Sequence, residues 1–84
     1  MKFQIGIVKE YNGYYGTIIT SSETYKFLNK DIGENEIIEV NDYVIFRGER
    51  INDDYRAYFV KFFSKNAKDF SDKTMFEKFV VKGN

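Results

Sequence analysis

The chain has 84 residues, the length of one small domain. It contains no cysteine and no histidine, which excludes disulfides, thiolate zinc sites and histidine-based catalysis. The formal net charge is zero, but residues 1–30 carry +2, residues 31–54 carry −6 and residues 55–84 carry +4. A polar partner would therefore meet the outer thirds of the chain, although ordinary surface charge explains the same distribution.

No stretch of the sequence is apolar over the length of a membrane span, and residues 1–6 lack an apolar signal segment. We therefore expect a soluble cytoplasmic protein with no membrane partner and no cofactor. The frequent Lys, Ile, Asn and Tyr have AT-rich codons, which indicates a bacterial or phage genome. We also expect no enzymatic activity, because there is no phosphate loop and the carboxylate pair Asp53-Asp54 lies in a predicted turn without apolar enclosure.

Alternating apolar residues predict a first strand over residues 2–11, with Phe3, Ile5 and Ile7 on one parity. Val8 interrupts this alternation, which predicts a bulge or a strongly coiled strand near Gly6. The next elements expected along the chain are a hairpin turn at Asn12-Gly13, a strand over residues 16–20, a turn over residues 21–23, and a strand over residues 24–28 in which Tyr25 and Phe27 share one face and Lys26 and Leu28 the other.

The second half of the chain predicts a polar, acidic loop over residues 29–42, with one helical turn at Lys30–Gly33. A fourth strand is expected over residues 42–47, a charged turn over residues 48–54 and a fifth strand over residues 55–62. Five short strands separated by turns are typical of a small barrel or sandwich, and closure into a barrel removes exposed sheet edges.

Five acidic residues in this region raise the question of a calcium site: Asp31, Glu34, Glu36, Glu39 and Asp42. They lack the alternating Asp/Asn spacing and the central glycine of a regular calcium loop. We therefore expect a solvated loop and no metal.

Residues 64–84 form a C-terminal extension to the predicted barrel of residues 1–63. Ser71 is a helix-capping residue, and Phe70 and Met75 have the spacing of a hydrophobic staple, which predicts a short helix over about 72–80. Four apolar residues fall on one side of that helix: Met75, Phe76, Phe79 and Val80. Such a short helix must dock, either on its own barrel or, through Met75, Phe76 and Phe79, in a homodimer or on a protein partner.

Residues 6–12 read Gly-Ile-Val-Lys-Glu-Tyr-Asn, Gly16 follows, and residues 55–60 read Tyr-Arg-Ala-Tyr-Phe-Val. This order of motifs resembles the bacterial cold-shock domain, whose opening is Gly-x-Val-Lys-Trp-Phe-Asn and whose ending is Pro-Gln-Ala-x-x-Val. Residues 25–32 occupy the place of its second RNA-binding motif. The resemblance covers about residues 5–62 and implies an all-β, five-stranded antiparallel barrel of the oligonucleotide/oligosaccharide-binding (OB) type. The short C-terminal helix predicted above lies outside the resemblance. The opening also fits the S1-type RNA-binding domain, which shares this barrel.

The cold-shock family binds single-stranded RNA or DNA by stacking bases on exposed aromatic rings. Most of those rings are missing here, because the family's Trp and Phe or His positions hold Glu10, Thr17, Ile19, Lys26, Leu28 and Asn29. Each stacked base contributes about 1–3 kcal/mol, so the resemblance implies weak, sequence-tolerant binding. An alternative is a protein-interaction or structural OB module that has lost nucleic-acid binding.

Several cationic and aromatic residues remain where the family binds its ligand. Tyr11 and Tyr58 are also typical of half-buried barrel aromatics, and Arg56 has Asp53 or Asp54 as an alternative partner. Lys9 and Lys26 also fit ordinary solvated positions. The candidate nucleic-acid-binding residues are Lys9, Tyr11, Tyr14, Tyr15, Lys26, Leu28, Arg56 and Tyr58.

Overall fold

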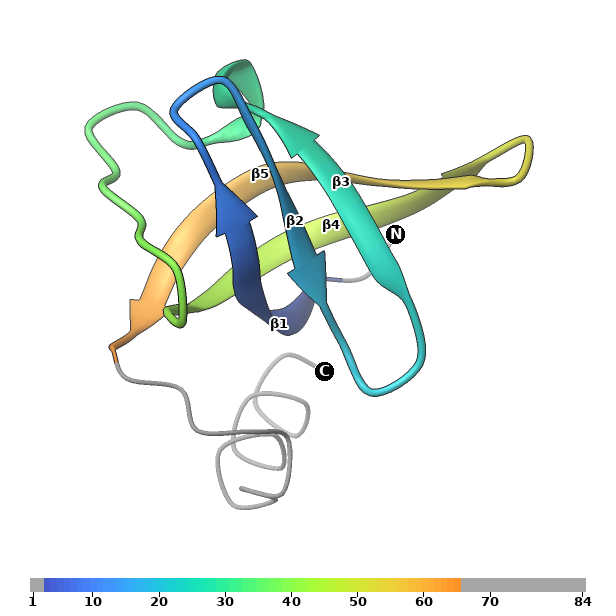
Figure 1. The fold of residues 1–84 in the computed structure, drawn as a ribbon, viewed down its shortest axis with the longest axis horizontal. Coiled ribbons are helices and arrows are strands. Elements are labelled where there is room, and N and C mark those ends of the chain that lie inside the picture. The colour runs from blue at the N-terminus through green and yellow to red at the C-terminus, as the bar shows by residue number, and fades with distance from the viewer. Residues whose placement is uncertain (1–2, 66–84) are drawn as a thin grey trace.

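Residues 3–65 are the part of the chain that the computed structural model describes (Figure 1). The predicted helix over 72–80 and the contact residues Met75, Phe76 and Phe79 lie outside this range. Within it the chain is all-β apart from one 3₁₀ turn and the connecting loops. The elements are β1 (Phe3–Tyr11), β2 (Tyr15–Ile19), β3 (Thr24–Leu28), η1 (Asn29–Asp31), β4 (Tyr43–Ile51) and β5 (Asp54–Ser64).

The strands close into a barrel in the order β1-β2-β3-β5-β4, with β4 returning to β1. Four of the neighbouring pairs are antiparallel, but β3 and β5 are parallel, with Lys26 opposite Arg56. The expectation of a wholly antiparallel barrel is therefore wrong at this one seam. The reason is geometric, because strand direction cannot alternate all the way around a closed ring of five strands.

The hairpin of β4 and β5 is longer than the sequence predicts and projects beyond the barrel (Figure 1). The predicted turn over 48–54 is too long, because the ladder continues to the pair Ile51–Asp54 and the chain reverses at residues 52–53, with a φ of 57° at Asn52. Gly48 belongs to β4 rather than to a turn. A Cβ on it would lie 2.6 Å from the ring of Tyr25, so this glycine permits close packing.

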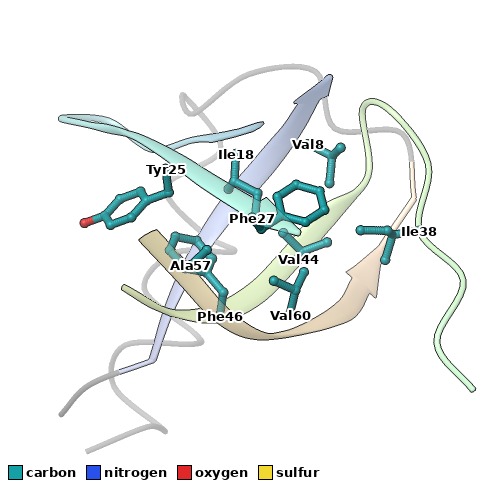
Figure 2. Packing of buried hydrophobic residues seen from close by; sticks show 9 residues of the cluster. All are labelled: Val8, Ile18, Tyr25, Phe27, Ile38, Val44, Phe46, Ala57 and Val60. Carbon is teal, nitrogen blue, oxygen red and sulfur yellow. The ribbon is translucent and has the colours of Figure 1, made fainter. Parts of the chain in front are cut away.

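The core fills the inside of the barrel with side chains from all five strands and Ile38 from the loop before β4 (Figure 2). Phe27 and Phe46 are its largest fully buried members. The predicted division of β3 into two faces is confirmed, since Tyr25 and Phe27 are buried and Lys26 and Leu28 are exposed. Burying a side chain of this size stabilises the fold by roughly 1.5–3 kcal/mol.

β1 buries apolar residues on both sides, which explains the interrupted alternation at Val8. Val8 belongs to the barrel core, whereas Ile5 and Ile7 belong to a second buried cluster with Tyr43. The register shift lies between Val8 and Glu10, so the bulge predicted near Gly6 is found at Lys9. The partly buried residues packed against the second cluster are Ile19, Ile45 and Phe63.

The loop between β3 and β4 begins with the 3₁₀ turn at Asn29–Asp31, one residue earlier than the helical turn predicted at Lys30–Gly33. Three of its acidic side chains accept backbone N–H groups: Asp31 accepts from Leu28 at 2.8 Å, Glu36 from Phe62 at 2.7 Å and Asp42 from Glu39 at 2.8 Å. Glu34 and Glu39 are exposed, as a solvated loop predicts.

No cluster of three or more possible metal-ligating carboxylates occurs within residues 3–65. Across the same residues, no helix is long and apolar enough to cross a bilayer.

Candidate functional site

One outward face of the barrel is formed by β2 and β3, whose inward residues are buried in the core. Three register pairs lie on it side by side: Tyr15 with Leu28, Thr17 with Lys26, and Ile19 with Thr24. We call these six residues the β2–β3 face. Tyr15 is 60% exposed and Leu28 is 39% exposed, so the face offers an accessible ring and an accessible aliphatic side chain in neighbouring positions.

The cationic side of this face lies at the seam between β3 and β5. Lys26 on β3 is opposite Arg56 on β5. The guanidinium of Arg56 donates to the Asp31 carboxylate at 3.1 Å, and its central carbon lies 5.2 Å from the centroid of the Tyr58 ring. Arg56 is thus held in place from two sides.

Asp31 is a site residue that sequence reasoning missed. Its buried carboxylate accepts from the Leu28 backbone N–H as well as from Arg56, and therefore joins β3 to β5. The alternative pairing of Arg56 with Asp53 or Asp54 is wrong; Asp53 instead pairs with Arg50 at 3.3 Å. Asp31 and Arg56 are 25 residues apart in the sequence, so no local pattern could have predicted their contact.

The turn between β1 and β2 positions the two adjacent tyrosines. The side-chain carbonyl of Asn12 accepts from the backbone N–H groups of Tyr14 at 2.9 Å and Tyr15 at 3.0 Å. Tyr15 then enters β2 and stands on the β2–β3 face, whereas Tyr14 remains in the turn and is 79% exposed.

Tyr11 is placed differently, since its ring is half-buried. It lies 5.5 Å from the ring of Phe27, and its hydroxyl accepts from the Asn29 amide at 2.7 Å. Tyr11 therefore packs against the core and anchors the start of η1, in agreement with the barrel-aromatic alternative.

β1 contributes charge of both signs next to β2. Lys9 is exposed at the bulge. Glu10 is opposite Thr17 and accepts from its hydroxyl at 3.3 Å. An acidic side chain thus lies beside the β2–β3 face. The structure brings together Tyr15, Lys26, Leu28 and Arg56, with Tyr58 beside Arg56.

No protein-family model and no curated protein matches this chain. Among solved structures, the fold is similar to Drosophila Unr CSD456, with a TM-score of 0.66 and 18% sequence identity. The likeness covers 82% of this chain but 30% of that chain. The fold is that of a cold-shock or OB-like domain.

The end of β5 carries a further charged contact. The Lys65 ammonium lies 2.7 Å from the Glu39 carboxylate and 3.6 Å from that of Asp42. The hydrogen bond from Lys65, followed by its charge, lowers the pKa of Glu39, and the same hydrogen bond raises the pKa of Lys65. This contact ties the loop before β4 to the end of β5.

Proposed function

We propose that this protein binds single-stranded RNA or DNA across the β2–β3 face and the adjoining part of β5, and that it acts by binding rather than by catalysis. The observation that carries the proposal is the adjacency of Tyr15 and Leu28 to Lys26 and Arg56 in the strand register. Tyr15 would stack on a base, and Leu28 beside it would make apolar contact with the same base. Lys26 and Arg56 would neutralise phosphates. The cold-shock-like fold supports this assignment.

The same residues predict weak and sequence-tolerant binding. Tyr15 is the one aromatic ring that the β2–β3 face presents, and each stacked base contributes roughly 1–3 kcal/mol. Glu10 places a carboxylate beside Thr17, where it would repel phosphates. Lys26, Arg56 and the exposed Lys9 would neutralise about three phosphates, which predicts a log–log salt slope of about −2 for a single strand.

Titration with a labelled oligo-dT or oligo-U at low salt tests the proposal directly. Backbone amide shifts are expected to concentrate in residues 9–20 and 26–29 and at Arg56. Affinity should fall roughly tenfold to twentyfold between about 50 and 200 mM salt. If no amide shifts at high micromolar oligonucleotide, the proposal fails and the barrel is instead a protein-interaction or structural module.

The substitution Lys26→Gln separates phosphate contacts from non-specific effects. It should weaken binding for every sequence and make the salt slope shallower by about one unit or slightly less. The matched control is Lys61→Gln, because Lys61 is also an exposed lysine but is paired with Ile45 on β4. An equal effect of the two substitutions would contradict the assignment of Lys26 to the site.

A further inference from the structure

Phe59 is an apolar side chain turned outward in the middle of β5. Phe59 is 58% exposed, whereas the next residue, Val60, is fully buried. The φ angle of Phe59 is 54°, a left-handed conformation that a bulky residue rarely adopts. The ladder with β4 is irregular here, because one residue between Ile45 and Arg47 faces two residues between Tyr58 and Lys61. Phe59 therefore lies in a β-bulge that returns Val60 to the core and leaves the ring outside.

The surroundings of this ring form a shallow hollow of about 230 Å³, lined by Arg47, Glu49, Tyr58 and Phe59. We call it the Phe59 hollow. The central guanidinium carbon of Arg47 lies 5.7 Å from the centroid of the Phe59 ring. A ring flanked by a cation is the arrangement on which single-stranded nucleic acids stack their bases.

The Phe59 hollow adjoins the β2–β3 face through the pairing of β3 with β5 and of β5 with β4. Lys26 on β3 is opposite Arg56 on β5, Arg56 lies over the Tyr58 ring, and Tyr58 is opposite Arg47 on β4. From Arg56 to Phe59, cationic and aromatic side chains therefore alternate. A single-stranded nucleic acid that passes Lys26 and Arg56 would next reach the Phe59 hollow.

We infer that the Phe59 hollow is an added subsite that stacks one base of a single-stranded nucleic acid extending from the β2–β3 face. This inference rests on the proposed function. The acidic Asp31 and Glu49 accompany the three cations Lys26, Arg47 and Arg56 along this path. Because Arg47 and Glu49 give the hollow itself no net charge, its contribution comes from stacking on the ring rather than from phosphate neutralisation.

The test compares oligo-dT of about four and about nine nucleotides, lengths within the site sizes of OB folds. Phe59→Asn removes the ring but keeps a residue that tolerates positive φ. It should weaken binding of the longer oligonucleotide at least about fivefold, change binding of the shorter one less than about twofold, and leave the salt slope unchanged. The control is Ile37→Asn, since Ile37 is a 79% exposed apolar residue in the loop before β4; it should affect neither length.

A second measurement needs no substitution. In the wild-type protein, the longer oligonucleotide should shift the amides of Arg47, Tyr58 and Phe59, and the shorter one should leave them in place. If both lengths bind and Phe59→Asn changes neither affinity, this inference is overturned while the proposed function stands. If neither length binds the wild-type protein, the proposed function itself fails.

Discussion

Asp31 and Arg56 show how a single polar contact positions the candidate site. The Asp31 carboxylate is 7% exposed and the Arg56 side chain 26% exposed, so water screens their contact less than that of a surface ion pair. The carboxylate also accepts the backbone N–H of Leu28. One side chain therefore fixes the end of β3, the start of η1 and the cation on β5.

Replacement of this carboxylate should cost stability. Asp31→Ala leaves the Leu28 N–H and the Arg56 guanidinium without their acceptor and is expected to lower the free energy of unfolding by about 1–3 kcal/mol. Asp31→Asn keeps an oxygen for Leu28 and should fall between the alanine variant and the wild type. Urea denaturation measures both.

The control for this prediction is Asp53→Ala, because the Asp53 side chain is fully exposed in its contact with Arg50. It should change stability by less than about 0.5 kcal/mol. Equal losses for Asp31→Ala and Asp53→Ala would show that the Asp31 contact has no special structural role.

At the scale of the element, bulges and a close approach between strands shape the barrel. The bulge in β1 at Lys9 and the bulge in β5 at Phe59 each let a strand change which residues face the core. Gly16 allows β2 to approach β1, because a Cβ there would meet the carbonyl oxygen of Glu10 and would lie 2.6 Å from the ring of Phe27. These local irregularities let short strands curve into a closed barrel.

Gly16→Ala should therefore destabilise the barrel by about 1–3 kcal/mol, because neither a backbone carbonyl nor a fully buried ring moves easily. The matched substitution is Gly33→Ala, whose nearest neighbour would be the Glu36 side chain at 3.0 Å, and it should cost clearly less. Thermal and urea unfolding followed by circular dichroism compare the two. A smaller loss for Gly16→Ala than for Gly33→Ala would contradict the close approach of β2 to β1.

At the scale of the whole molecule, stability is expected to depend on pH through Glu39 and Lys65. The pKa of Glu39 is lowered from its ordinary value of 4.5, so its contribution is present above that value and is lost as pH falls through the lowered folded-state pKa. The pKa of Lys65 is raised from 10.5, so its contribution is present below that value and is lost as pH rises through the raised folded-state pKa.

Glu39→Gln tests this dependence. Near pH 7 the variant should have a lower urea midpoint than the wild type. This difference should vanish in acid well below pH 4.5, where residue 39 is uncharged in the wild type as well as in the variant. High salt should also reduce the difference, because both partners are exposed. Glu34→Gln, an exposed acid of the same loop, serves as the control. A difference that persists unchanged into acid would contradict the assignment to the ion pair.

The sequence alone determined the strands and much of the face they present. Alternation with period two is a local property, and it correctly separated Tyr25 and Phe27, which are buried, from Lys26 and Leu28, which are exposed. The same local signals failed over residues 48–51, where charged side chains resemble a turn although the backbone continues in the ladder with β5. Side-chain polarity reports exposure, and an exposed strand is as polar as a loop.

Only the tertiary structure decided the parallel seam, the Asp31–Arg56 contact and the outward ring of Phe59. Each depends on residues that are distant in sequence: Lys26 meets Arg56 across the seam, and Arg47 covers Phe59 from the neighbouring strand. Closure of the ring sets these neighbours, because a fifth strand must lie parallel to one of its two partners. The pattern of apolar and polar residues along the chain does not show which neighbouring strand the parallel partner will be.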